Sequence, residues 1–182
     1  MADPINEEVT ANGNEENVTS GTMQKIKSSK VAVLLKTTDG YKRMGKGITD
    51  LPISYGAKTT SETYVDEDNA TTTVDSYEIG IDTEQTAIKG EPVFDYIDSL
   101  RRSLATGSDC ETEAVLVDIY NLSGSESSAN GTGQKFGATI AITDFELKGG
   151  EVVKIKYKLS LNGTPSDVSV SIANKVITVT ES

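Results

Sequence analysis

The sequence of 182 residues is long enough for one globular domain with tails. Its formal net charge of −11 argues against tight binding of nucleic acid, because that binding depends on Lys and Arg residues that neutralise phosphates. The chain has no His, so the common Ser-His-Asp, Cys-His and zinc sites lack their central residue. It has a single Cys, so no internal disulfide can form. We therefore expect no catalytic residue, metal ion or cofactor.

Residues 1–30 are predicted to form a flexible acidic N-terminal arm, and residues 31–182 the folded domain. The first 21 residues carry five acidic side chains and no basic one. Such a segment buries too little apolar area to offset the entropy cost of ordering. It also lacks the pattern of a secretory signal, and no apolar stretch is long enough to span a membrane. We therefore expect no membrane anchor.

The apolar residues 31–35 predict a first strand that is buried on both faces. A loop is expected over residues 39–47. Two long, half-buried strands follow, because apolar residues alternate with polar ones in each of them. The alternating residues are Leu51, Ile53, Tyr55 and Ala57 in the first strand, and Tyr77, Ile79 and Ile81 in the second.

An acidic, Thr-rich loop over residues 65–72 joins these two strands. Hairpin loops commonly have two to five residues, so a connection of this length and polarity predicts a projecting arm that reaches another subunit. The residues of the predicted contact are Val65, Asp66, Glu67, Asp68, Asn69 and Ala70.

The same loop contains the oxygen-bearing side chains that Ca²⁺ prefers. The spacing does not match an EF-hand, because Thr71 stands where the sixth position needs Gly and Tyr77 where the twelfth needs Glu. We expect a solvated acidic loop and no metal site.

One amphipathic helix is predicted at about residues 92–105. Pro92 suits the first helical position, where its missing N–H costs nothing. Gly107 suits the left-handed position after the last turn. The predicted apolar stripe consists of Val93, Ile97, Leu100 and Leu104.

The rest of the chain is predicted to be β. A strand at residues 114–120 precedes a Ser/Gly/Asn-rich loop at 122–134. The apolar phase then shifts at Thr143 and Asp144, which indicates a β-bulge. Residues 153–161 alternate most clearly, with three lysines on the polar face. Residues 162–165 are interpreted as a turn, and strands at 168–172 and 176–179 flank a turn at Asn174 and Lys175.

The predicted fold is mainly β: a β-sandwich or partial barrel of about seven to eight strands with one flanking amphipathic α-helix. Eight acidic residues and no basic one lie between Lys58 and Lys89. This interval is either a solvated face, or an interface or lumen of fixed negative charge.

The order of these segments resembles the major tail (tube) proteins of long-tailed, siphovirus-like phages and prophages of Gram-positive bacteria. The resemblance runs from about residue 31 to 121 and weakens beyond Tyr120. It is carried by the segment GKGITDLPISYGAKTTSETYVDEDNATTTVDSYEIGID, followed by PVFDYIDSLRR.

The resemblance implies a structural virion protein that polymerises as stacked hexameric rings, with a lumen β-barrel, into a tube that conducts DNA to the host. It implies that rings stack through residues 65–72 and the N-terminal arm, and that the lumen is lined by acidic residues, for which we favour Glu78 and Asp82. Lys154, Lys156 and Lys158 are expected to lie away from the lumen. DNA would pass transiently, since an acidic wall repels phosphates.

The implied partners are further copies of the chain, the tape-measure protein, and tail terminator and baseplate proteins. The implied location is the virion tail, after synthesis in the bacterial host cytoplasm. The alternative is the inner tube of a contractile tail or injection device. A bacterial surface adhesin or pilin-like binding module is less favoured, because no export signal is recognised.

Overall fold

The computed structural model describes residues 25–125 and 128–180, and residues 1–24 of the predicted N-terminal arm lie outside the described residues. Its elements in chain order are η1 (Ser28–Lys30), β1 (Val31–Thr37), β2 (Gly40–Arg43), β3 (Ile53–Ser54), β4 (Ala57–Glu62), β5 (Thr71–Tyr77), β6 (Ile79–Thr86), α1 (Pro92–Ser103), η2 (Gly107–Cys110), β7 (Glu111–Asp118), η3 (Ile119–Asn121), β8 (Ser123–Ser125), β9 (Ser128–Glu146), β10 (Lys154–Ala173) and β11 (Val176–Thr180). The mainly-β prediction with one α-helix is confirmed.

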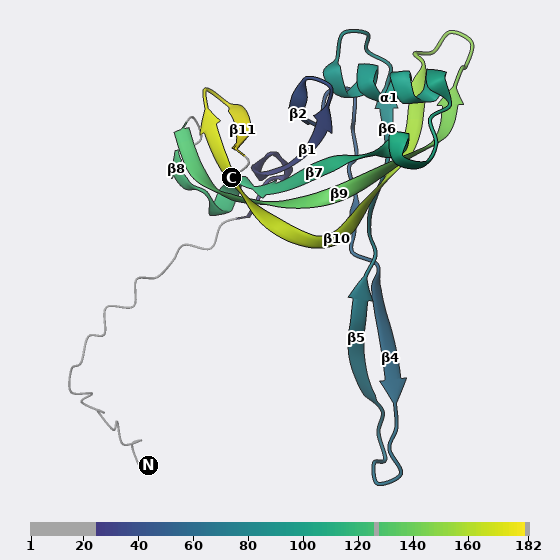
Figure 1. The fold of residues 1–182 in the computed structure, drawn as a ribbon, viewed down its shortest axis with the longest axis vertical. Coiled ribbons are helices and arrows are strands. Elements are labelled where there is room, and N and C mark those ends of the chain that lie inside the picture. The colour runs from purple at the N-terminus through teal and green to yellow at the C-terminus, as the bar shows by residue number, and fades with distance from the viewer. Residues whose placement is uncertain (1–24, 126–127, 181–182) are drawn as a thin grey trace, which may run out of the picture.

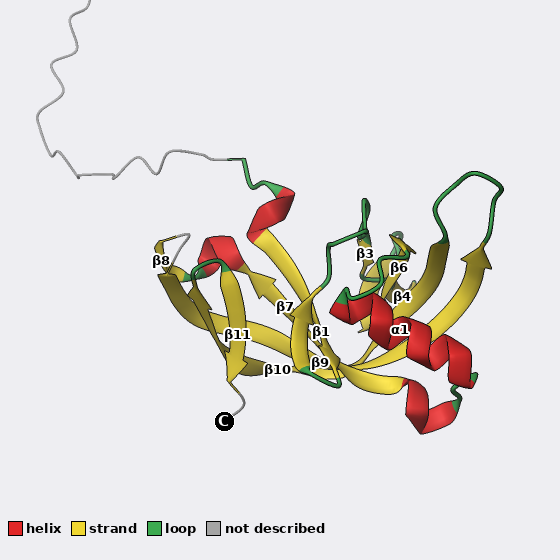
Figure 2. Cartoon of the chain, turned by 90° about the horizontal axis from the view of Figure 1, so that it is seen from above, coloured by secondary structure: helices red, strands yellow, loops and turns green. Residues whose placement is uncertain are grey.

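Nine of the strands form one antiparallel sheet, and β4 and β5 form a separate two-stranded ladder. The main path of the sheet is β2-β1-β7-β9-β10-β6-β3, with β8 added to β9 and β11 added to β10. The sheet is strongly curved, α1 lies on one side of it, and the β4–β5 hairpin projects from the other (Figure 1). The view from above shows α1 across the end of the sheet that carries β3 and β6 (Figure 2).

Two apolar clusters stabilise the curved sheet. The first packs α1 against the sheet and includes Val93, Ile97, Ile81, Ile155 and Leu159. The second lies on the opposite face of β1 and β7 and reaches the C-terminal half of β10; its buried residues are Ala32, Leu34, Val115, Val117, Val168 and Val170. β1 is therefore buried on both faces, as predicted: Leu34 and Leu35 are 1% and 0% exposed and belong to different clusters.

Buried polar residues anchor the start of α1 to the sheet. The carboxylate of Glu91 caps the helix by accepting a hydrogen bond from the Phe94 backbone N–H at 2.6 Å, and a second from Gln85 Nε2 at 2.9 Å. The Tyr157 hydroxyl donates to Gln85 Oε1 at 3.3 Å. Burial raises the pKa of Tyr157. This chain of contacts fixes the helix over β6 and β10.

The end of α1 differs from the prediction. The helix ends at Ser103, and Leu104 takes the left-handed conformation (φ 51°) directly after the last turn. Gly107 also has a left-handed φ of 60°, as predicted, but it lies three residues further on, at the start of η2. The Ala105 N–H donates to the Leu100 carbonyl, which turns the chain away before the predicted stripe is complete. Leu104 is consequently 82% exposed, and Phe94 is buried on the helix in addition to Val93 and Ile97.

Two segments predicted as loops are strands. Within residues 39–47, β2 forms a hairpin with β1, whose Thr37 hydroxyl donates to the Gly40 carbonyl at 3.0 Å. Residues 122–134 contribute β8 and the first part of β9. Small residues are required there: a Cβ on the buried Gly133 would lie 3.0 Å from side-chain atoms of both Val115 and Val170. The close approach of the neighbouring strands outweighs the weak strand propensity of such small residues.

The predicted turn at 162–165 is wrong, because β10 runs through it as one strand with an irregularity between Asn162 and Ser166. The described residues form eleven strands where seven to eight are predicted. Two predicted strands merge into β10, but β2 and β8 are additional, and the two long predicted strands are each divided, into β3 and β4 and into β5 and β6. The bulge at Thr143 is confirmed, since Lys156 pairs with Asp144 and Tyr157 with Ile142. The turn at Asn174 and Lys175 is also confirmed, and both residues have positive φ.

Candidate functional site

The β4–β5 hairpin, hereafter the arm, is the main candidate for a functional surface. Every residue from 54 to 78 is exposed. The arm extends from the sheet as a ribbon of two strands (Figure 1). An isolated two-stranded hairpin is at best marginally stable in water. The arm would therefore gain stability when a partner covers it.

The register of the arm separates an uncharged face from a charged one. Cross-strand partners lie on the same face of a ladder. The uncharged face holds the pairs Ala57/Tyr77, Thr59/Val74 and Ser61/Thr72. The charged face holds the pairs Lys58/Ser76, Thr60/Thr73 and Glu62/Thr71. Asp75 joins the charged face, because the Thr60 hydroxyl donates to its carboxylate at 2.5 Å.

Gly56 and Glu78 form the base of the arm. The Glu78 N–H donates to the Gly56 carbonyl at 3.3 Å, and Gly56 has a φ of +50°. A Cβ at this position would lie 2.6 Å from the Glu78 carbonyl oxygen, so the crossing requires glycine. Lys58 and the Glu78 carboxylate form an exposed ion pair at 3.1 Å.

An apolar cavity of about 660 Å³ lies beside the base of the arm. Tyr55 and Tyr77, which are 55% and 60% exposed, line it together with Phe136, Leu161 and Pro165. The half-buried strand environment predicted for Tyr55, Ala57 and Tyr77 is therefore wrong. The strands leave the sheet at this point, so these side chains have no covering layer.

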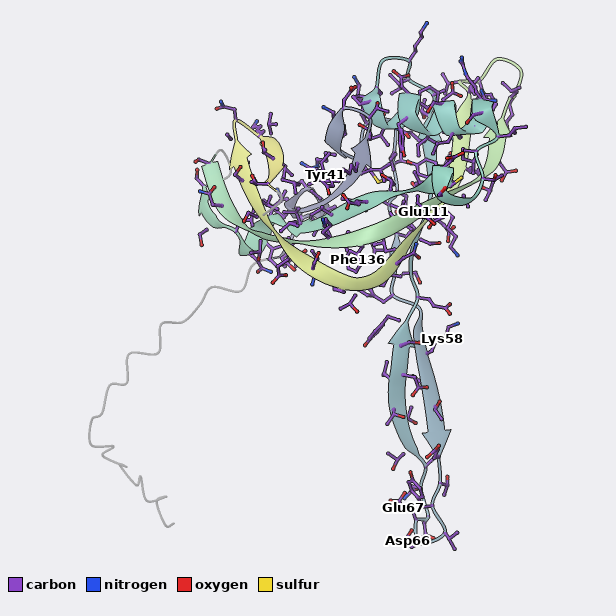
Figure 3. All side chains as sticks on the ribbon, in the orientation of Figure 1. Tyr41, Lys58, Asp66, Glu67, Glu111 and Phe136 are labelled. Carbon is purple, nitrogen blue, oxygen red and sulfur yellow. The ribbon has the colours of Figure 1, made fainter. Side chains whose placement is uncertain are left out.

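The six predicted contact residues, Val65, Asp66, Glu67, Asp68, Asn69 and Ala70, are all exposed in the loop at the tip of the arm. The loop spans residues 63–70, two positions earlier than the predicted 65–72, because β4 ends at Glu62 and β5 begins at Thr71. Asp66 and Glu67 lie at the extreme end of the arm, whereas Lys58 lies near its base (Figure 3). The structure thus places the acidic residues as far as possible from the sheet.

The sheet face opposite α1 carries a ladder of ion pairs. Lys154 contacts Glu84 at 2.5 Å, and Lys156 contacts Glu146 and, at 3.6 Å, Glu84. These contacts lower the pKa of both carboxyls and raise the pKa of both lysines. The intervening β10 residues face the buried cluster beneath α1; they are Ile155, Tyr157 and Leu159.

Asp82 belongs to this charged face. It lies opposite Lys158 in the pairing of β6 with β10, and register partners project to the same side. The expectation that Asp82 faces the lumen and the expectation that the lysines lie away from it therefore cannot both hold. Residue parity compares positions within one strand only and does not include the register of the neighbouring strand. Glu78 precedes β6 and lies at the base of the arm.

A second ion cluster centres on Glu113 of β7. Its carboxylate accepts hydrogen bonds from Lys36 at 2.5 Å and the Tyr41 hydroxyl at 2.7 Å, and Lys135 lies 3.5 Å away. These contacts, led by the hydrogen bond from Lys36, lower the pKa of Glu113 to about 2. The cluster joins four strands: β1, β2, β7 and β9.

Among the described residues, no group of three or more His, Cys, Asp or Glu side chains is arranged to hold a metal ion. No helix in residues 25–125 and 128–180 is long and apolar enough to cross a membrane. Cys110 is half-buried and forms no disulfide.

Sequence reasoning places Tyr55 and Tyr77 on half-buried strands and assigns no role to Tyr64 and Val74, and all four side chains are exposed. A usable signal is nevertheless present. In residues 58–62 and 71–76, the even-numbered and the odd-numbered positions are both largely polar. A half-buried strand has one apolar set, whereas a ribbon exposed on both faces needs none.

Comparisons with known proteins assign no family. No family model and no curated protein matches the chain. Among solved structures, the sheath/tube terminator of an extracellular contractile injection system (PVC) in its extended state has a TM-score of 0.46 and 13% identity, covering 84% of this chain and 100% of that one. A chain in the anti-feeding prophage baseplate has a TM-score of 0.45 and 11% identity, covering 85% and 99%.

Proposed function

We propose that this chain is a structural protein of a phage tail, and that copies of it assemble as stacked hexameric rings into the tube that conducts DNA to the host. The observation that carries the proposal is the arm: a ribbon exposed on both faces, with exposed apolar side chains and a cluster of carboxylates at its tip. The hexameric tube comes from the resemblance of the segment order to major tail proteins.

The exposure of the arm favours an assembly function over a monomeric one. A monomer pays the conformational entropy of ordering more than twenty exposed residues without burying them. Covering the uncharged face, which includes Val74 and Tyr77, would offset that cost. The natural cover in a tube is the neighbouring ring.

The two ends of the sheet supply lateral contacts in this proposal. The main path ends in β2 on one side and β3 on the other, so the sheet is open within the described residues. Open sheet edges invite pairing with another chain. A closed ring of copies satisfies these edges by pairing each sheet with the next one.

We assign the charged sheet face to the lumen, with Asp82 on it and Glu78 at the adjoining base of the arm. The lysines on this face do not hinder the passage of DNA in this arrangement, because each one faces a carboxylate. Glu84 pairs with Lys154, Glu146 pairs with Lys156, and Asp82 lies opposite Lys158. A phosphate that approaches the wall then meets paired cations and excess carboxylates, which limits trapping.

The proposed partners beyond the chain itself are the tape-measure protein and the tail terminator and baseplate proteins. The proposed location is the virion tail. Electron microscopy of the concentrated, purified protein tests the proposal. Rings or tubes with a central channel are expected, and a sample that stays monomeric under all conditions, including addition of tail-initiation components, contradicts it.

A further inference from the structure

The tip of the arm combines an apolar pair with a run of acids. Tyr64 is 58% exposed and Val65 is fully exposed, with a relative exposure of 109%. Asp66, Glu67 and Asp68 follow directly. The Glu67 N–H donates to the Tyr64 carbonyl at 3.0 Å, so a turn holds the apolar pair and the acids next to each other.

A groove of matching chemistry lies at the end of the curved sheet that carries β8 (Figure 1). It has a volume of about 400 Å³ and is formed by the segment before β1 and by residues around η3 and β8. Ile119 and Leu122 form apolar parts of the lining, and Ile26 is 58% exposed there. Lys25, Lys27 and Lys30 also line it. The lining of the groove thus combines apolar and basic side chains.

The charges around the groove are mainly positive. The Arg43 guanidinium donates to the Ser29 carbonyl at 3.2 Å, which adds a fourth cation beside the three lysines. Asp118 is an acidic residue close to the groove, and its charge raises the pKa of Tyr120, which also lines the groove. An acidic segment is therefore attracted to this surface, and the attraction weakens with salt.

The tip of one chain cannot be the occupant of its own groove. The groove includes residues of β8, at one end of the curved sheet, whereas the tip lies at the far end of the arm (Figure 1). The arm would have to fold back across the sheet to join them. A tip from a second copy meets no such obstacle.

We propose that the arm tip of one copy docks into this groove of a second copy. Tyr64 and Val65 enter the apolar part, and Asp66 and Asp68 lie against Lys25 and Lys27. The inference rests on the proposed tube function and adds the receiving surface for the arm. Between stacked rings, it makes each arm a link that binds through apolar burial and is oriented by charge.

Cysteine cross-linking tests the contact directly. Two variants in a Cys110→Ser background, Val65→Cys and Ile26→Cys, are mixed and gently oxidised, and cross-linked peptides are identified by mass. We expect the mixed link between positions 65 and 26 to dominate, because a disulfide requires a Cα separation of about 4–7 Å. The matched control replaces Ile26→Cys with Leu147→Cys, at a residue that is 72% exposed in the turn between β9 and β10. Equal yields for both pairs overturn the proposal.

Charge reversal gives a second, independent readout. The double variant Lys25→Glu/Lys27→Glu should raise the protein concentration needed for assembly by roughly tenfold or more, since placing like charges together weakens an interface. Adding Asp66→Lys/Asp68→Lys should restore assembly. The control Lys46→Glu/Lys89→Glu changes the net charge equally at exposed sites that do not line the groove. Failure of the rescue, or an equal effect of the control, contradicts the proposed contact.

The outcomes separate this inference from the tube function. Tubes formed normally by the wild type and by Lys25→Glu/Lys27→Glu leave the proposed function standing and refute the groove. A preferred link from Val65→Cys to a cysteine introduced by Val18→Cys assigns the tip to the N-terminal segment and likewise refutes the groove. A wild type that forms no tubes refutes the function, and the cysteine pair then still reports on the contact, because it needs only two copies.

Discussion

Lys158 of β10 and Asp82 of β6 are direct partners across the sheet, and both project from the face opposite α1. Asp82, which we assign to the lumen, therefore shares its face with lysines. This face differs from a basic DNA-binding surface because its lysines form ion pairs. Lys154 contacts a carboxylate on β6, and Lys156 contacts one on β9.

The first prediction concerns this balance. Replacing Asp82→Lys places a second cation beside Lys158, and assembled tubes should then retain short DNA fragments that wild-type tubes release. Co-sedimentation of DNA with tubes at low salt measures the effect. The control Asp109→Lys adds the same charge in η2, on an exposed residue. Similar DNA retention by both variants argues against a lumen position for Asp82.

The second prediction concerns the base of the arm. Gly56→Ala should cost about 1–2 kcal/mol locally, because a non-glycine residue at positive φ is strained and its Cβ would meet the Glu78 carbonyl. Hydrogen exchange should accelerate for amides of β4 and β5, and assembly should require more protein. Gly45→Ala is the matched control, since no atom lies within 4 Å of its added Cβ. Unchanged exchange in the arm of Gly56→Ala would contradict the assigned crossing geometry.

The third prediction concerns the end of α1. Leu104 holds a left-handed conformation while 82% exposed, so Leu104→Gly should raise the free energy of unfolding by about 1 kcal/mol. Thermal unfolding measures it. Ser103→Gly, one residue earlier and within the helix, should instead lower stability by about 0.5–1 kcal/mol. Destabilisation by both changes would show that Leu104 makes contacts that outweigh its strain.

The fourth prediction concerns pH. The pKa of Glu113 is lowered to about 2 in the folded state, so its stabilising contribution is complete above about pH 4.5 and is lost as pH falls from there through about 2. Glu113→Gln should lower stability at pH 7 by about 1 kcal/mol, a value discounted for partial exposure. It should also flatten the pH dependence of unfolding in that window. The control Glu111→Gln, on the same strand, should do neither; equal pH profiles for both variants refute the assignment.

Sequence periodicity is sufficient for elements that bury an apolar set. It predicts the first strand, α1, the bulge at Thr143 and the alternation in β10, because each pattern reports contact with the core. The positions of Val65 to Ala70 in an exposed loop between two strands also follow from composition.

Sequence reasoning fails where neighbouring strands decide the structure. Residues 122–134 look like a loop until Val115 and Val170 are seen to require glycine at position 133. The side of the sheet on which Asp82 and Lys158 project is likewise set by register, which no single strand encodes. The groove at Lys25 and Lys27 joins segments almost one hundred residues apart and leaves no local pattern.

The most direct test of the central claim is electron microscopy, with sedimentation, of the wild type and a variant that lacks residues 66–70. The loop is exposed and polar, so its deletion should leave the unfolding temperature nearly unchanged. We predict tubes of stacked rings for the wild type, and folded protein without tubes for the deletion variant. Normal tubes from the deletion variant, or none from the wild type, would contradict polymerisation through the arm.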